Sequence, residues 1–160
     1  MPTNQINLPI TNRSNCNGLD SVIKKIDPSK TKVEKYGRYT TNTTYFDKNG
    51  VEILHFSDRR YQYGYAYICT DADGKQCSVT LHDLDKDGNI NTMHTYYNKD
   101  GSAPKSIYDT RLEQYDYSVR SSEDNGIFDE VTHDNLPWHQ KPKSEDKKGI
   151  FDTFLDWLGL

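Results

Sequence analysis

The chain has 160 residues, a formal net charge of −4, 33% hydrophobic residues and 12 tyrosines. This length fits one folded domain, and the tyrosine content favours a β core, because tyrosine suits half-buried strands. The weak negative charge, without long runs of lysine or arginine, argues against nucleic acid as a partner. No apolar stretch reaches the ~20 residues that a membrane-spanning helix needs, so no membrane span is expected.

The N-terminal arm, residues 1–32, is rich in polar residues and begins without the basic and then apolar segment of a secretion signal. We therefore expect a cytoplasmic protein, export by a leaderless route, or numbering that starts at a mature end. Before Pro28, four apolar residues recur at the spacing of one helix face: Leu19, Val22, Ile23 and Ile26. A short N-terminal helix is predicted there, while the rest of the arm either packs on the domain or stays disordered.

A β domain is predicted for residues 33–138, because turn signals punctuate it. Five polar turns end in glycine and have similar sequences: Asp47–Gly50, Asp71–Gly74, Asp85–Gly88, Asn98–Gly101 and Glu123–Gly126. Asn-Gly and Asp-Gly pairs favour the positive φ angles of tight hairpins. With turns recurring about every 9 to 16 residues, the pattern is typical of an antiparallel meander or a small β-sandwich of about eight strands.

The clearest strand is Tyr61 to Tyr67, in which tyrosine alternates with smaller residues, so that the four tyrosines share one face of the sheet. That tyrosine column is expected to pack in the core, and the alternative is a stacking surface for sugars or peptides. Six further segments have strand-like composition: 38–46, 51–56, 76–82, 90–97, 112–120 and 127–132.

The segment from Asp83 to Asn91 reads Asp-Leu-Asp-Lys-Asp-Gly-Asn-Ile-Asn, with acids at alternate positions. It resembles the calcium loop of EF-hands and, in its second half, that of dockerins. The resemblance implies calcium as a cofactor. It also implies carboxylate ligands from three aspartates, a backbone carbonyl from one asparagine and an oxygen, direct or through water, from another: Asp83, Asp85, Asp87, Asn89 and Asn91.

The surroundings of this loop narrow the kind of calcium site that we expect. The twelfth position, where such loops carry a bidentate acid, is His94, and neither flank has the pattern of a long amphipathic helix. A structural calcium site between two strands is therefore predicted. The alternative is an ordinary solvated hairpin turn, which the four sister turns favour.

Cys69 and Cys77 lie symmetrically about the turn at Asp71–Gly74, so a hairpin would place them opposite each other on adjacent strands. Cross-strand Cα separations of about 4.5 to 5.5 Å suit a disulfide. We expect that disulfide if the protein matures in an oxidising compartment, and two buried thiols if it remains in the cytosol. With the bridge formed, Cys16 stays unpaired.

A charged linker, residues 139–148, separates the β domain from the C-terminal segment 149–160. In that segment apolar residues share one stripe of a short amphipathic helix, with acidic residues opposite. A helix of this length is marginal alone in water, so we expect it to dock on a protein partner. The predicted docking residues are Ile150, Phe151, Phe154, Leu155, Trp157 and Leu158.

These features suggest three functions. The first, which we favour, is a non-enzymatic β module that docks through its C-terminal helix onto a larger protein assembly or carrier. The second is a secreted, calcium-stabilised effector or adhesin-like domain, which the acidic segment and the cysteine pair support. The third is a hydrolase or toxin domain. It has no nucleophile motif, although His82, Asp83 and His94 together in one concave pocket would favour it.

Overall fold

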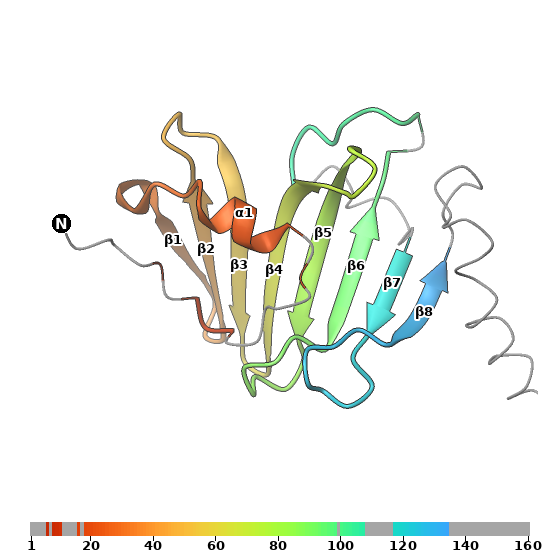
Figure 1. The fold of residues 1–160 in the computed structure, drawn as a ribbon. Helices are drawn as coiled ribbons and strands as arrows, with labels where there is room; N and C mark the ends of the chain where they lie inside the picture. The colour runs from red at the N-terminus through yellow and green to blue at the C-terminus, as the bar shows by residue number, and fades with distance from the viewer. Residues whose placement is uncertain are drawn as a thin grey trace, which may run out of the picture.

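The computed structural model describes residues 6, 8–10, 16, 18–98, 100–107 and 117–134. Eight antiparallel strands form one sheet, and their order in the sheet is their order in the chain, β1 to β8 (Figure 1). The predicted meander is therefore confirmed. The sandwich alternative was wrong, because the eight strands of the described chain belong to a single open sheet rather than to two packed layers.

Most of the strands are joined by short connections, as the recurring turn signals predicted, and the exception is the long connection over residues 97–116. The elements are α1 (Leu19–Ile23), a 3-10 turn (Pro28–Lys30), β1 (Lys32–Tyr36), β2 (Thr40–Phe46), β3 (Glu52–Arg59), β4 (Gln62–Thr70), β5 (Gln76–Asp83), β6 (Thr92–Tyr96), β7 (Tyr117–Arg120) and β8 (Glu130–Asp134). The first strand was not predicted from the sequence. It is an edge strand whose residues are mostly exposed, so it lacks the alternation of apolar and polar residues that marks a half-buried strand.

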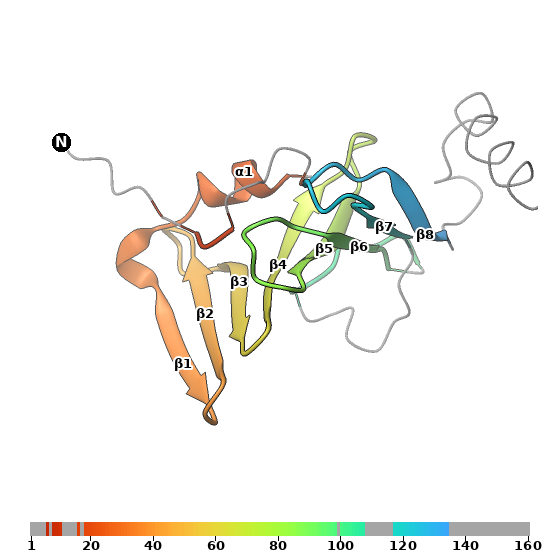
Figure 2. The same cartoon turned by 90° about the horizontal axis from the view of Figure 1, so that it is seen from below.

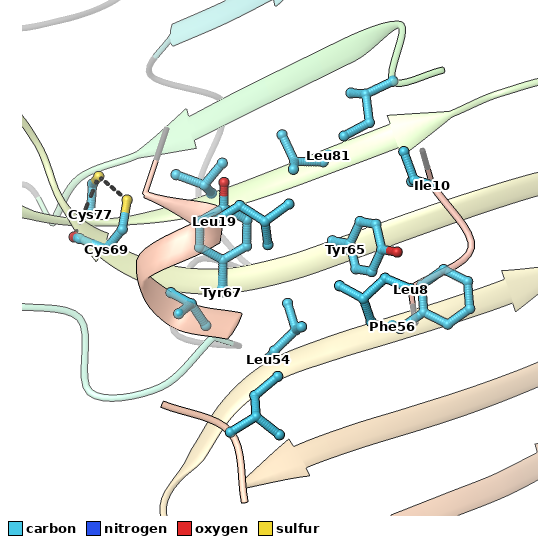
Figure 3. Packing of buried hydrophobic residues seen from close by; sticks show 14 residues of the cluster. Leu8, Ile10, Leu19, Leu54, Phe56, Tyr65, Tyr67, Cys69, Cys77 and Leu81 are labelled. Carbon is cyan, nitrogen blue, oxygen red and sulfur yellow. Dashed lines mark hydrogen bonds between the residues drawn. The ribbon is translucent and has the colours of Figure 1, made fainter. Parts of the chain in front are cut away.

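The hydrophobic core lies on one face of the sheet, between the central strands and the N-terminal arm (Figure 3). Leu19 from α1 and Ile10 from the arm lie over this face, and both are almost completely buried. Tyr65 and Tyr67 of β4 are 2% and 0% exposed, so core packing of the tyrosine column is confirmed for these two residues. Tyr61, at the turn before β4, is 67% exposed and does not join them.

The short helix predicted in the arm is confirmed as α1, which has only five residues. A helix of this length gains little from its own hydrogen bonds, so its packing on the sheet must hold it in place. Its N-cap is Gly18, with a φ of 70°, and a Cβ at this position would lie 2.6 Å from Cys69 Cβ. Glycine is therefore required twice at position 18, for the left-handed backbone and for the close approach to β4.

The opposite face of the sheet, which we call the open face, is mostly polar along β4 and β5. It carries the side chains that alternate with the core residues along each strand. The sheet is also bent: in Figure 2, α1 lies on one side, and β1 and β2 turn toward the other side. The open face is therefore the concave one.

In a meander, every second connection lies at the same end of the sheet. The turns after β1, β3, β5 and β7 share one end, and those after β2, β4 and β6 share the other (Figure 1). This rule brings together the loops that follow β5 and β7, although they are far apart in sequence. They build the site described below.

The linker at 139–148 and the predicted docking helix at 149–160 lie outside the described residues, and the docking residues stay a prediction. Among the residues that are described, no helix is long and apolar enough to cross a membrane.

Candidate metal centre

Three aspartates of the predicted calcium loop come together in space. Asp83 is the last residue of β5, and Asp85 and Asp87 follow in the connection to β6, which we call the acidic loop (residues 83–91). One carboxylate oxygen from each aspartate lies within 4.8 Å of the others. Such an arrangement is unfavourable for three negative charges unless a cation lies among them.

Asp83 is the most unusual of the three, because its side chain is completely buried. Its Oδ2 atom accepts a hydrogen bond of 2.9 Å from Gly88 N–H. Its Oδ1 atom is also buried, and no donor in the described part of the chain reaches it. Burial raises the pKa of Asp83 above its ordinary value. Burying a carboxylate oxygen without a hydrogen-bond donor destabilises the folded state, and a bound cation would offset this loss of free energy.

A fourth carboxylate reaches the cluster from the connection between β7 and β8. Asn91 Nδ2 donates a hydrogen bond of 3.0 Å to Asp124 Oδ1, and Ser121 N–H donates to the carbonyl of Asn91 at 2.9 Å. Burial and the nearby carboxylates of Asp87 and Asp85 raise the pKa of Asp124 to about 6. Asp124 thus experiences the negative charge of the acidic loop directly.

The lysine within the acidic loop does not neutralise the cluster. Lys86 Nζ pairs with Asp58 Oδ1 on β3 at 2.8 Å and lies 4.3 Å from the centre of the Tyr63 ring. Among the residues that the structure describes, no lysine, arginine or histidine forms an ion pair with any of the four clustered aspartates. The negative charge is therefore concentrated at one place and is not balanced by the surrounding chain.

The backbone of both loops is also unusual. Within the described ranges, Lys86 and Asp124 are the two residues other than glycine with positive φ, at 59° and 52°. Residues with side chains adopt this region at a cost, and they are found there mainly where the surrounding structure holds them. One such residue lies in each of the two loops that bring the carboxylates together.

The two asparagines predicted as ligands have other partners as well. Asn89 donates to Asp87 from its backbone N–H (2.8 Å) and from its side chain (3.1 Å). The hydrogen bond from the Asn89 backbone lowers the pKa of Asp87. Asn91 Oδ1 accepts from Leu84 N–H at 2.9 Å. Asn91 therefore links the start of the acidic loop to Asp124, and its role as a direct or water-mediated ligand stays a prediction.

The arrangement suits a hard cation. The three clustered aspartates, with Asp124 nearby, offer carboxylate oxygens, which calcium prefers and which softer metals such as zinc and copper prefer less than imidazole or thiolate. His94, at the twelfth position of the loop, points away from the cluster: its Nδ1 lies 2.7 Å from Ser118 Oγ on β7. Asp124, which lies close enough to Asp87 and Asp85 for their charges to raise its pKa, is the candidate for the carboxylate that the loop sequence lacks at position twelve.

Sequence reasoning did not connect Asp124 with the acidic loop, because 33 residues separate it from Asn91. The meander itself contained a signal. Since alternate turns share an end of the sheet, the turns Asp85–Gly88 and Glu123–Gly126 had to lie at the same end once the strand order was known. What the sequence could not supply was the contact between the two loops, in which Asn91 bonds to Asp124 and Ser121.

The catalytic arrangement considered for a hydrolase is not assembled. The ring centres of His82 and His94 lie 5.4 Å apart, on the open face of the sheet. His82 lies beside Gly64 of β4, and His94 Nδ1 is within hydrogen-bond distance of Ser118 Oγ on β7. Asp83 follows His82 directly in the strand and projects toward the opposite side, because neighbouring strand residues alternate. Its carboxylate faces the acidic loop and not the two imidazoles.

The two predicted disulfide cysteines are opposite each other, as the hairpin required. Cys69 on β4 pairs in register with Cys77 on β5, both are buried, and their sulfur atoms lie 3.6 Å apart as free thiols. The pair is therefore close enough to oxidise with a small adjustment. The disulfide itself stays a prediction.

Comparison with models of protein families finds no match for this chain, and comparisons with curated proteins and with solved structures find none either.

Proposed function

We propose that this protein is a β module that binds calcium between its acidic loop and the β7–β8 connection. The observation that carries the proposal is Asp83 Oδ1, a buried carboxylate oxygen for which the described chain provides no hydrogen-bond donor. The clustered oxygens of Asp85 and Asp87 lie beside the Asp83 carboxylate. Asp124 approaches from the second loop and is the candidate for the closing ligand.

Calcium at this position would act as a structural clamp. Without calcium, Asn91 holds the two loops together, because it forms hydrogen bonds with Asp124 and Ser121 of the second loop. Asn91 also accepts a hydrogen bond from Leu84 N–H within the acidic loop. With it, mutual repulsion of the carboxylates becomes attraction to a shared ion. The clamp would hold the end of β5 against the connection between β7 and β8, two parts of the sheet that lie far from α1 along the chain.

A weak site is the expected form, with a dissociation constant in the range of extracellular calcium modules, roughly 0.1 to 1 mM. The loop has glycine at its bend and no closing carboxylate of its own, so ordering the two loops together reduces the net affinity. This affinity fits the secreted, calcium-stabilised domain that the sequence suggested.

The test is thermal unfolding in chelator and in millimolar calcium. At about 10 mM calcium, which is roughly 10 to 100 times the expected dissociation constant, the native protein should gain about 1.4 to 3 kcal/mol, seen as a rise of roughly 5 to 10 °C in Tm. Asp85→Ala should lose most of that rise, because it removes an exposed ligand without disturbing the strands. Magnesium should stabilise less, since it demands a stricter octahedral geometry.

Asp129→Asn is the matched control. Asp129 lies in the same β7–β8 connection, but its carboxylate accepts hydrogen bonds from Ser122 N–H (2.9 Å) and from the Ser122 hydroxyl. This change removes one negative charge near the site without touching the cluster, so the calcium response should persist. Equal responses of the native protein and Asp85→Ala would rule out the clamp.

Attachment to a larger assembly through the C-terminal helix remains our prediction from sequence. It is compatible with the calcium clamp, because the clamp stabilises the domain and the helix would connect it to a partner.

A further inference from the structure

The open face of the sheet contains a groove that the calcium site does not use. Gly64 and Ala66 of β4 form its floor, because both project onto the open face between two taller rows. His55 and Ser57 of β3 stand on one side, and Thr80 and His82 of β5 stand on the other. The groove has a volume of about 350 Å³, at the lower end of the range for sites that bind small molecules.

The small residues of the floor are not required by the backbone. Glycine within a strand weakens it and commonly marks a bulge, a bend or a place where a ligand comes close. The pairing of β4 with β3 and β5 is continuous through Gly64, so there is no bulge at this position. Its φ is not positive, and a Cβ there would be in ordinary contact with His82 Nδ1 at 3.4 Å. Without a bulge or a positive φ at this position, the glycine keeps the floor of the groove low enough for a ligand to approach the strand closely.

The groove is polar and nearly neutral. Burial lowers the pKa of His55 and brings that of His82 to about 4, so both rings are uncharged at pH 7. The remaining polar groups along the groove are amides and hydroxyls, apart from Arg59 at one end. Glu34 lies close enough to His55 to oppose the effect of Arg59 on it. An uncharged ligand suits this balance better than an anion or a cation.

The hydrogen bonds within the groove leave both donors and acceptors for a ligand. Ser57 Oγ donates to Asn42 Oδ1 at 2.9 Å, which leaves the Asn42 amide N–H groups with no partner in the described chain. Gln62 Nε2 donates to His82 Nδ1 at 2.9 Å, which leaves the Gln62 side-chain carbonyl as an acceptor. The same bond places the proton of neutral His82 on Nε2. Hydroxyl groups, which donate and accept, match such a mixed lining.

We propose that this groove binds an uncharged saccharide of one or two rings, lying along β4 on Gly64 and Ala66. The sugar ring would lie against Gly64 and Ala66, and its hydroxyl groups would form hydrogen bonds with Asn42 and Gln62. The affinity is weak, with a Kd on the order of 1 mM, because a shallow polar groove gains few contacts beyond those it loses with water. The groove and the calcium site lie on different faces of the sheet, so the saccharide proposal and the calcium proposal are tested independently.

The experiment is saturation-transfer NMR on the full chain with glucose, galactose, N-acetylglucosamine, their disaccharides cellobiose, lactose and chitobiose, and glucuronate as the charged comparison. At least one neutral sugar should show transfer and a Kd of roughly millimolar size. Ala66→Phe should weaken that binding at least tenfold, because the ring fills the floor while phenylalanine suits a strand. Thr70→Phe is the matched control: Thr70 is exposed, on the same strand and outside the groove, so binding should be unchanged.

Asn42→Ala provides an independent variant that leaves the floor intact, and it should weaken binding by about three- to tenfold through the lost amide contact. Unfolding curves of all variants in urea identify any that fail to fold. No transfer to any neutral sugar, unchanged binding in Ala66→Phe, or tighter binding of glucuronate than of glucose would each overturn the proposal.

Discussion

The two turns that flank β5 have similar sequences and different chemistry. At the start of the strand, Asp71 Oδ1 accepts from Asp73 N–H and Lys75 N–H, both at 2.9 Å, and Oδ2 accepts from Tyr97 OH at 2.8 Å. Both oxygens of Asp71 therefore have donors from the protein itself. At the end of the strand, Asp83 Oδ2 accepts from Gly88 N–H, and its buried Oδ1 has no partner at hydrogen-bond geometry in the described chain.

This difference shows what separates a turn from an ion site. The sequence Asp-x-Asp-Gly supplies acids in both places, so the acids alone do not distinguish them. The number of hydrogen-bond donors per carboxylate distinguishes the two turns. Hydrogen bonds from the chain already stabilise the charge of Asp71, so a cation would add little there. Around Asp83, carboxylates outnumber the donors.

Of the changes in stability that distinguish the two turns, we expect the largest from the cysteines beside the Asp71 turn. Oxidised glutathione should convert the Cys69–Cys77 thiols into a disulfide, which closes a loop of fewer than ten residues and stabilises the domain by about 2.5 kcal/mol. Intact mass after alkylation counts the thiols, and Tm with and without reductant measures the effect. Cys77→Ser should show no dependence on reductant. Two alkylatable thiols at these positions after oxidation would contradict the prediction.

Removing the acid from each turn should separate the two directly. Asp71→Ala breaks three hydrogen bonds and should cost about 2 kcal/mol in the free energy of unfolding, equally with and without calcium. Asp85→Ala should cost little in chelator, because Asp85 is exposed and accepts one long bond of 3.3 Å from Asp87 N–H. Urea unfolding of both variants in each buffer checks this. A calcium-dependent cost for Asp71→Ala would erase the distinction.

The smallest effect is a gain in stability. Asp124→Asn keeps the acceptor for Asn91 Nδ2 and removes a charge that the acidic loop repels. In chelator it should therefore stabilise the domain by about 1 kcal/mol, a value reduced by solvent screening because the side chain is partly exposed. In calcium the same variant should gain less from the ion than the native protein does. A variant that is less stable than the native protein in chelator would show that repulsion is not the dominant force at the site.

The sheet could be predicted from the sequence because its signals are local. Hairpin glycines and the alternation from Tyr61 to Tyr67 fix strand directions and faces within a few residues. The site was predicted only in part, since Asp83, Asp85 and Asp87 are neighbours in sequence but Asp124 is not. Its place near Asp87 depends on how two separate loops pack, and the groove at Gly64 and Ala66 depends on how three strands align, and neither is a local signal. Edge strand β1 was missed because exposed strands carry no hydrophobic pattern.

The hairpin turns at the end of the sheet away from the acidic loop have a consequence for how this chain could change over time. At Gly50 and Gly74 an added Cβ would meet no atom within 4 Å, and each turn is closed by the carboxylate of its own aspartate. Insertions there would lengthen a loop at small entropic cost and touch neither the ion site nor its ligands. Changes at that end leave the ion site untouched, while the other end is constrained by two loops that must keep their contacts with each other.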